Sequence, residues 1–176
     1  DSDSISFSLS GTDADSFAIS SSGALTFNNA PDYETKDSYS LIITASDGTA
    51  SVSQTVTITI SNINEVPQIS ALSSNQLPDE NQVSVVTVSA SDPDASTTLT
   101  YSLSGTDSSL FAISSSGVIT FSSAPDYETP GDADGDNNHQ INVVVSDGSL
   151  SVTQAITIQV QNVADLISGV AVDGYV

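Results

Sequence analysis

Short acidic motifs near the ends of predicted strands are the residues of this sequence whose chemistry stands out. Pro-Asp-Tyr-Glu occurs at 31–34 and again at 125–128, Asp-Pro-Asp lies at 92–94, and aspartates alternate at 132, 134 and 136. Paired carboxylates support two kinds of chemistry, namely proton transfer between an acid and a base in a cleft, or coordination of a hard cation by oxygen. The composition of the chain helps to decide between them.

The chain carries 22 acidic residues and a single basic one, Lys36, so its formal net charge is −21. This charge repels nucleic acid phosphates and anionic membrane surfaces, and we expect no nucleic-acid partner. A compact state with such a charge also repels itself, because two like charges about 4 Å apart cost roughly 4 kcal/mol at an effective dielectric constant near 20. The composition therefore favours bound metal over proton transfer.

Other catalytic constellations are missing from the sequence. It contains no cysteine and no Gly-x-Ser-x-Gly motif, and its single histidine, His139, has no evident nucleophile beside it. We expect His139 to lie on the surface and the protein not to be an enzyme. Without cysteine, disulfides are excluded and zinc or copper are poor candidates. No apolar run is long enough to span a bilayer, so we expect no direct membrane insertion.

The sequence contains two copies of one unit. Residues 5–35 align with residues 99–129 without a gap and are identical at about two-thirds of positions. A period of about a hundred residues is typical of tandem immunoglobulin-sized domains. Apolar and polar residues alternate with a period of two, and no stretch has the spacing of an amphipathic helix. We predict an all-β protein built of tandem, seven-stranded Greek-key β-sandwiches.

The repeat also predicts the domain boundaries. Residues 1–65 form a first domain that begins in its third strand, because the copy starts abruptly at Ile5. Residues 66–165 form a complete second domain. Residues 166–176 begin a following module or provide an exchanged strand for a partner molecule.

Several strands and turns of the second copy are readable from its pattern. Val83 and Val85 change phase to Val86 and Val88, which indicates a β-bulge. Phe111 to Ile113 and Ile119 to Phe121 read as a short hairpin, and the Asp-Gly pair at 147–148 reads as the turn of a longer one.

Topology sorts the acidic motifs. In such a sandwich, residues that follow the first, fifth and seventh strands share one end, whereas residues that follow the second and sixth share the other. The end of the first domain and the start of the second are therefore expected to meet at one linker, where oxygen ligands come from eight residues: Asp32, Glu34, Asn62, Asn64, Glu65, Asp92, Asp94 and Asp147. Calcium suits this set, because it takes 6 to 8 hard oxygen ligands in flexible geometry.

A separate acidic loop distinguishes the second copy. Asp132, Asp134 and Asp136 alternate around a glycine, like the first half of an EF-hand loop, but the bidentate glutamate at the twelfth position is missing. The loop is either a further calcium site or a solvated acidic surface.

Together, the repeated motifs resemble a known family, the bacterial cadherin-like tandem repeats of large surface adhesins and of some polysaccharide-degrading systems. The resemblance rests on Ser-Leu-Ser-Gly-Thr-Asp at 8–13 and 102–107, Pro-Asp-Tyr-Glu-Thr at 31–35 and 125–129, Ser-Asp-Gly at 46–48 and 146–148, and Asn-Ile-Asn-Glu-Val-Pro at 62–67. It implies that Glu80 is the glutamate that ends the first strand of the second domain. Glu80 is then expected to join Asp126 and Glu128, with Asn162 and Asp165 nearby.

The function that follows is mechanical. Calcium at the linkers would stiffen an extended adhesin at a bacterial cell surface or in the extracellular space, since loss of the ion frees the joint. The expected partners are flanking repeats, with a homophilic, cell-surface or polysaccharide ligand. The alternative is a calcium-dependent carbohydrate-binding module, although the chain has no tryptophan on which a sugar could stack.

Overall fold

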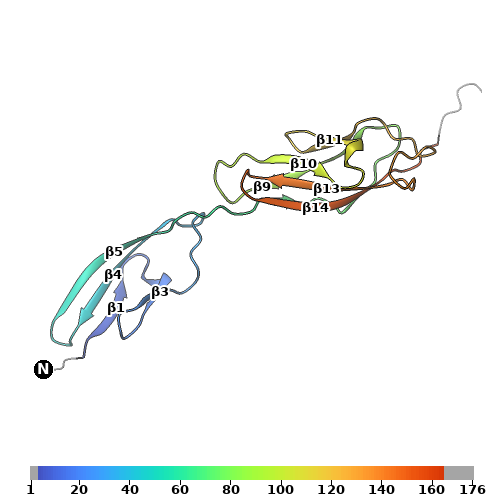
Figure 1. The fold of residues 1–176 in the computed structure, drawn as a ribbon. Helices are drawn as coiled ribbons and strands as arrows, with labels where there is room; N and C mark the ends of the chain where they lie inside the picture. The colour runs from blue at the N-terminus through green and yellow to red at the C-terminus, as the bar shows by residue number, and fades with distance from the viewer. Residues whose placement is uncertain (1–3, 165–176) are drawn as a thin grey trace, which may run out of the picture. The chain divides into compact units, whose positions relative to one another are not determined.

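The computed structural model of the chain describes residues 4–164. They divide into two compact units, one that ends at Asn64 and one that begins at Glu65, and Figure 1 shows that both are built of β-strands. Within the described residues, the helical elements are two single-turn 3₁₀ helices, η1 (Ala14–Ser16) and η2 (Ser108–Leu110). The predicted all-β class is confirmed. No helix in residues 4–164 is long and apolar enough to cross a membrane.

Within residues 4–64, the first unit contains five strands. The strands β1 (Ser6–Ser10), β4 (Ser38–Ser46) and β5 (Ser51–Thr59) form an antiparallel sheet in the order β1-β4-β5, and β2 (Phe17–Ile19) pairs with β3 (Leu25–Phe27). Leu41 on β4 is fully buried, and the Phe17 ring packs against Phe27 and Tyr39. This aromatic cluster joins the two sheets, because Tyr39 lies on β4 and the phenylalanines lie on β2 and β3.

The second unit is a more complete sandwich. One layer is a four-stranded sheet in the order β10-β13-β14-β7, formed by β10 (Thr100–Ser104), β13 (Asn138–Ser146), β14 (Ser151–Gln159) and β7 (Asn75–Gln76). The opposite layer contains β11 (Phe111–Ile113), β12 (Val118–Phe121) and β8 (Ser84–Thr87), in the order β11-β12-β8. The strands β6 (Gln68–Ser70) and β9 (Ser89–Ser91) pair with each other beside them.

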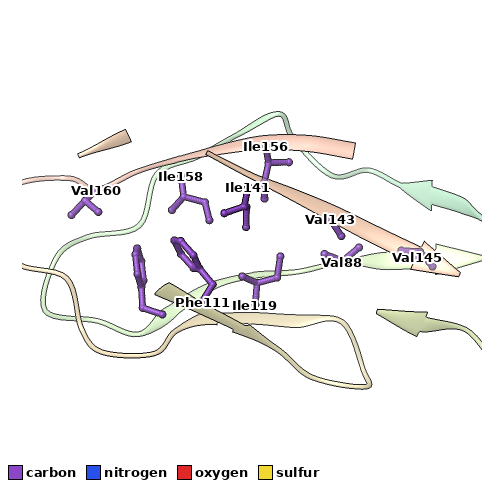
Figure 2. Packing of buried hydrophobic residues seen from close by; sticks show 10 residues of the cluster. Val88, Phe111, Ile119, Ile141, Val143, Val145, Ile156, Ile158 and Val160 are labelled. Atoms are coloured by element: carbon purple, nitrogen blue, oxygen red, sulfur yellow. The ribbon is translucent and has the colours of Figure 1, made fainter. Parts of the chain in front are cut away.

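The core of the second unit follows from strand alternation. Ile141, Val143 and Val145 on β13 are all buried, whereas the residues between them are partly exposed. Figure 2 shows these side chains, with those of β14, pointing toward Ile119 and Val88 of the opposite layer. Each fully buried aliphatic side chain contributes about 1.5–3 kcal/mol, so this double row is the main source of stability for the unit.

The predicted β-bulge and hairpins are confirmed. On the strand pair β8–β12, Ile119 lies opposite Val86 while Thr120 lies opposite Ser84, so Val85 is the extra residue of the bulge. The short hairpin pairs Phe111 with Phe121, and the long one pairs all nine residues of β13 with β14 around the turn at Asp147.

The expectation that His139 lies on the surface is wrong. Its side chain is 2% exposed, and its ring meets the rings of Phe111 and Phe121 edge-on, with centroids 5.5 and 5.4 Å away. Tyr39 has the equivalent position in the first unit, since Tyr39 lies opposite Ile58 and His139 opposite Ile158 in matching hairpins. His139 is therefore part of the core, where it takes the place of an aromatic residue.

The fold makes a prediction about two glycines with positive φ. A Cβ on Gly117 would lie 2.4 Å from the carbonyl oxygen of Val88, whereas a Cβ on Gly148 would meet nothing within 4 Å. We expect Gly148→Ala to lower the free energy of unfolding by about 1–2 kcal/mol, the cost of left-handed backbone. Gly117→Ala should cost about 3 kcal/mol or more, because a backbone contact must also shift. Urea denaturation of both variants measures the difference, and equal losses would contradict the placement of Gly117.

Candidate metal centres

Three acidic residues come together at one end of the second unit. Glu80 follows β7, while Asp126 and Glu128 follow β12, and each offers a carboxylate oxygen within 4.8 Å of the others. Glu80 is 3% exposed and bridges two segments, since its Oε2 accepts a hydrogen bond from Tyr127 N at 2.9 Å and its Oε1 accepts one from Val163 N at 2.7 Å. The backbone of this end is thus ordered around the Glu80 carboxylate.

The remaining carboxylates of this cluster face solvent. Asp126 Oδ1 accepts hydrogen bonds from the backbone N–H groups of Glu128 and Thr129, at 3.0 and 3.1 Å. Glu128 Oε1 accepts one from Asn162 Nδ2 at 2.7 Å, so the segment that follows β14 also reaches the cluster. Asp165, which the sequence assigned to the same place, lies outside the described residues.

The acidic loop forms a second cluster, in which Asp132, Asp134 and Asp136 also offer oxygens within 4.8 Å of one another. Asp132 is 9% exposed and accepts hydrogen bonds from Asp136 N at 2.8 Å and Asn137 N at 3.3 Å. Asn137 Nδ2 in turn donates to the carbonyl oxygen of Tyr127, at 2.9 Å. The loop is therefore folded back on itself and attached to the Pro-Asp-Tyr-Glu motif.

Crowding of negative charge has opposite effects on two aspartates of this loop. The hydrogen bond with Asp132 and the negative charge of Asp136 raise the pKa of Asp134 above its usual value. Burial would raise the pKa of Asp132 as well, but hydrogen bonds to that carboxylate outweigh burial, and its pKa is lowered. A cation among the three oxygens would remove the repulsion that Asp134 experiences.

The acidic loop is held in place by Asp107, a residue to which the sequence analysis gave no role of its own. Asp107 is 5% exposed, and its Oδ1 accepts a hydrogen bond from Ala133 N while its Oδ2 accepts one from Gln140 N, at 3.0 and 2.7 Å. Asp107 ends the Ser-Gly-Thr-Asp motif, which both repeats contain, and this repetition was the available signal.

The first unit shows the same arrangement with a different partner. Asp13 Oδ2 accepts a hydrogen bond from Ser40 N at 2.7 Å, and its Oδ1 forms an ion pair with Lys36. The Lys36 ammonium thus occupies the position that Ala133 N–H has in the second unit. Both partners lower the pKa of Asp13, the Lys36 hydrogen bond most strongly.

At the beginning of the second unit, Asp94 organises the backbone of the motif that precedes β6. Its Oδ2 accepts a hydrogen bond from Glu65 N at 3.0 Å, and carboxylate oxygens of Asp94 and Glu65 lie within 4.8 Å of each other. Asp94 N donates to Asp92 Oδ1 at 2.9 Å, while Asp92 Oδ2 is buried and accepts no hydrogen bond within residues 4–164. Asp147 accepts hydrogen bonds inside its own turn, from Ser149 N and Leu150 N.

The predicted ligands of the first unit lie after its third and fifth strands. Asp32 caps the turn that follows β3, because its carboxylate accepts hydrogen bonds from the Thr35 hydroxyl and from the Thr35 and Glu34 N–H groups. The bonds from Thr35 are the main reason why the pKa of Asp32 is lowered. Asn62 and Asn64 follow β5 and are exposed.

The donor atoms of these clusters fit a hard cation. All are carboxylate or amide oxygens, which are ligands for calcium, and the chain has no cysteine. His139 is enclosed by phenylalanines and contributes to none of the three-residue acidic clusters that the described residues form. The buried Asp92 Oδ2, which accepts no hydrogen bond within residues 4–164, has the oxygen chemistry that a calcium ligand needs.

Cadherin domains are among the solved structures with a similar fold. A mouse cadherin-23 fragment, EC22–24, matches with a TM-score of 0.65 and 27% identity, over 91% of this chain and 53% of that one. Protocadherin gamma B2 extracellular cadherin domains 1–5 match with a TM-score of 0.65 and 26% identity, over 92% of this chain and 34% of that one. Drosophila N-cadherin EC1–4 matches in fold at 21% identity, with a TM-score of 0.64, over 92% and 42% of the two chains.

These matches establish a cadherin-like β-sandwich fold for the chain. The chain spans about half the length of the cadherin-23 fragment. No protein-family model matches the sequence, and no curated protein matches it either.

The raised pKa of Asp134 predicts a pH effect in calcium-stripped protein. A raised pKa in the folded state means that Asp134 contributes stability at low pH, and that this stability is lost as pH rises from about 4 through the raised pKa. Asp134→Asn removes the titrating carboxyl and with it this loss of stability. We therefore expect the thermal midpoint of the variant, relative to that of wild type, to increase as pH rises from 4 to 7.

Asp13 provides a control of opposite sign. Its lowered pKa means that its contribution to stability is present at neutral pH and is lost as pH falls below about 4. Asp13→Asn should therefore lose in thermal midpoint relative to wild type as pH rises from below the lowered pKa to about 4, and the difference should then stay constant up to pH 7. Parallel profiles for the two variants would show that the local charge environments differ from those described.

Proposed function

We propose that this chain is a calcium-dependent structural and adhesion segment of a larger extracellular protein, of the cell-surface or secreted adhesin type. The observation that supports it best is the pair of acidic clusters in the second unit, Glu80 with Asp126 and Glu128, and the loop Asp132 to Asp136. In a chain with 22 acidic residues and one basic residue, side-chain cations cannot neutralise both clusters. A divalent ion can.

Calcium is the ion that the ligand chemistry favours. The clusters offer carboxylates from separate segments, which suits the flexible, oxygen-rich coordination of calcium better than the strict octahedron of magnesium. Extracellular calcium modules have dissociation constants of about 10⁻⁴ to 10⁻³ M, so such sites fill outside cells and empty in the cytosol. This agrees with an extracellular location, as do the extracellular cadherin domains of similar fold.

We further propose that calcium fixes the joint between consecutive domains. The order of the predicted ligands along the chain supports this. Asp32, Glu34, Asn62 and Asn64 belong to the first unit, whereas Glu65, Asp92, Asp94 and Asp147 belong to the second. An ion with ligands from both domains would restrict the angle between them. The partners are then flanking repeats of the same protein, with a homophilic or cell-surface contact made by the resulting rod, and the role is mechanical rather than enzymatic. A bacterial cell surface is the location that the sequence resemblance favours.

The calcium proposal predicts a gain in thermal stability. For a dissociation constant near 10⁻³ M, about 10 mM calcium should stabilise the second unit by about 1.4 kcal/mol per site, which corresponds to about 5–10 °C. Glu128→Gln should remove most of the contribution from its cluster. Asp15→Asn is the matched control, because it removes the same charge from an exposed position in η1.

Calorimetry with calcium, with magnesium and with chelator measures these shifts. An unchanged midpoint with calcium, or an equal response of the two variants, would refute calcium binding at the Glu80 cluster.

The joint proposal predicts a change in dimensions without a change in fold. We expect small-angle scattering from dilute protein to give a narrower range of maximum dimensions for the chain in calcium than in chelator. The circular dichroism spectrum should be nearly the same in both. Substitution of Asp92 and Asp94 by asparagine should make the calcium profile resemble the chelator profile. If calcium raises the melting temperature but leaves the scattering curve unchanged, calcium binds but does not fix the joint.

A further inference from the structure

The outer face of the four-stranded sheet in the second unit carries a groove. It has a volume of about 530 Å³ and lies across β13 and β14, beside the loop that leads into β7. Ile156 and Ile158 are buried, whereas the residues that alternate with them, Ala155, Thr157 and Gln159, are more exposed and line the groove; Ile141 and Ile156 also contribute to its floor. Amide and hydroxyl side chains line it, chiefly Asn75, Asn138, Gln140, Asn142, Thr157 and Gln159.

The groove is uncharged in a strongly charged chain. None of the described residues that line it is acidic, basic or aromatic, although the formal net charge of the chain is −21. Its amides are also available: within residues 4–164, the side chains of Gln140, Asn142 and Gln159 form no hydrogen bond, whereas Asn138 Nδ2 uses one on Asp136 O. Each free amide offers two donors and an acceptor to a ligand.

The first unit shows that the sheet does not need these amides. The paired residues Asn142 and Ala155 of the second unit correspond to Ile42 and Thr55 in the first, in the same hairpin register. Likewise, Gln140 corresponds to Ser40, and Gln159 to Thr59. One repeat therefore has short hydroxyl or aliphatic side chains where the other has amides, so the amides call for an explanation other than folding.

We propose that this groove binds an uncharged polysaccharide. Neutral sugars present hydroxyl groups that both donate and accept hydrogen bonds, which matches amides and hydroxyls without any charge. The acidic chain repels anionic polymers. A protein partner would be expected to anchor on a central apolar or aromatic cluster, whereas most residues that line this groove carry amide or hydroxyl groups.

The size and the chemistry of the groove also set its strength. Its volume lies within the range of about 300–1,000 Å³ that is usual for ligand sites. Because no aromatic ring is present for stacking, binding depends mainly on hydrogen bonds and is weak for a single site. The binding is independent of the proposed calcium sites, and tandem repeats would strengthen it by multivalency.

Affinity electrophoresis of the full chain tests the proposal. Native gels are cast with a neutral polysaccharide, one each of dextran, galactomannan, glucomannan and arabinoxylan, or with anionic hyaluronan as a comparison, in calcium throughout. We expect retardation in at least one neutral gel and none in hyaluronan. The triple variant Gln140→Ser, Asn142→Ile, Gln159→Thr should weaken binding about tenfold or more, since each hydrogen bond contributes about two- to tenfold.

The variants take their residues from the first unit, which favours correct folding. The control pair, Val144→Thr with Thr153→Ser, makes the same kind of exchange on the same sheet face outside the groove, where Thr44 and Ser53 of the first unit hydrogen-bond at 2.8 Å. The control pair should bind like wild type, and thermal melts confirm that all variants fold.

Three results would overturn the proposal. They are an absence of retardation in every neutral gel, equal retardation of wild type and triple variant, or self-association of the chain that the triple variant abolishes. The last result would assign the groove to a contact between copies of this chain. None of them bears on the calcium melts, so the two proposals fail separately.

Discussion

The scarcity of basic residues constrains how every carboxylate in this protein is stabilised. With one lysine in the chain, most of the described carboxylates rely on backbone N–H groups, as Asp107 does with Ala133 and Gln140, and Glu80 with Tyr127 and Val163. Hydrogen bonds of this kind favour the ionised form and order the backbone around it. They do not cancel the charge, so neighbouring carboxylates such as Asp132 and Asp134 still repel each other. The fold thus creates clusters that are ordered and negative at the same time, which is the arrangement a calcium ion requires.

Comparison of the two repeats shows which features the fold needs. The aspartate that ends Ser-Gly-Thr-Asp accepts two hydrogen bonds in both units, but Lys36 donates one of them in the first and Ala133 N–H in the second. The acidic loop therefore replaces a cation by a backbone donor, and in doing so it brings three further aspartates into the same region of the unit. This exchange adds negative charge to the second unit at the place where the loop is attached to Pro-Asp-Tyr-Glu, through the hydrogen bond from Asn137 Nδ2 to Tyr127 O.

Alternation and turn residues made much of the fold predictable. The bulge at Val85 and the hairpin at Asp147 depend on neighbours in the sequence, and a period of two reports them directly. The meeting of Glu80 with Asp126 was expected from the family resemblance, and strand order alone agrees with it, because residues after alternate strands share an end. By contrast, Ala133 and Asp107 are 26 positions apart and are joined by one hydrogen bond, from the Ala133 backbone N–H to the Asp107 carboxylate. No local sequence pattern specifies such a contact.

The error at His139 has a different cause, because the information was present in the sequence. His139 is in phase with Ile141 and Val143 along β13, and the repeat aligns it with Tyr39, so both signals place it inside. The polarity of His139 does not exclude it from the core, because an imidazole ring can pack edge-on against phenylalanine as a tyrosine ring does. The same reasoning applies in reverse to the amides of the outer face. Asn142 and Gln159 are out of phase with the core, so their polarity fits their exposure. The contrast with Ile42 and Thr59 is what distinguishes this face from the same face of the first unit.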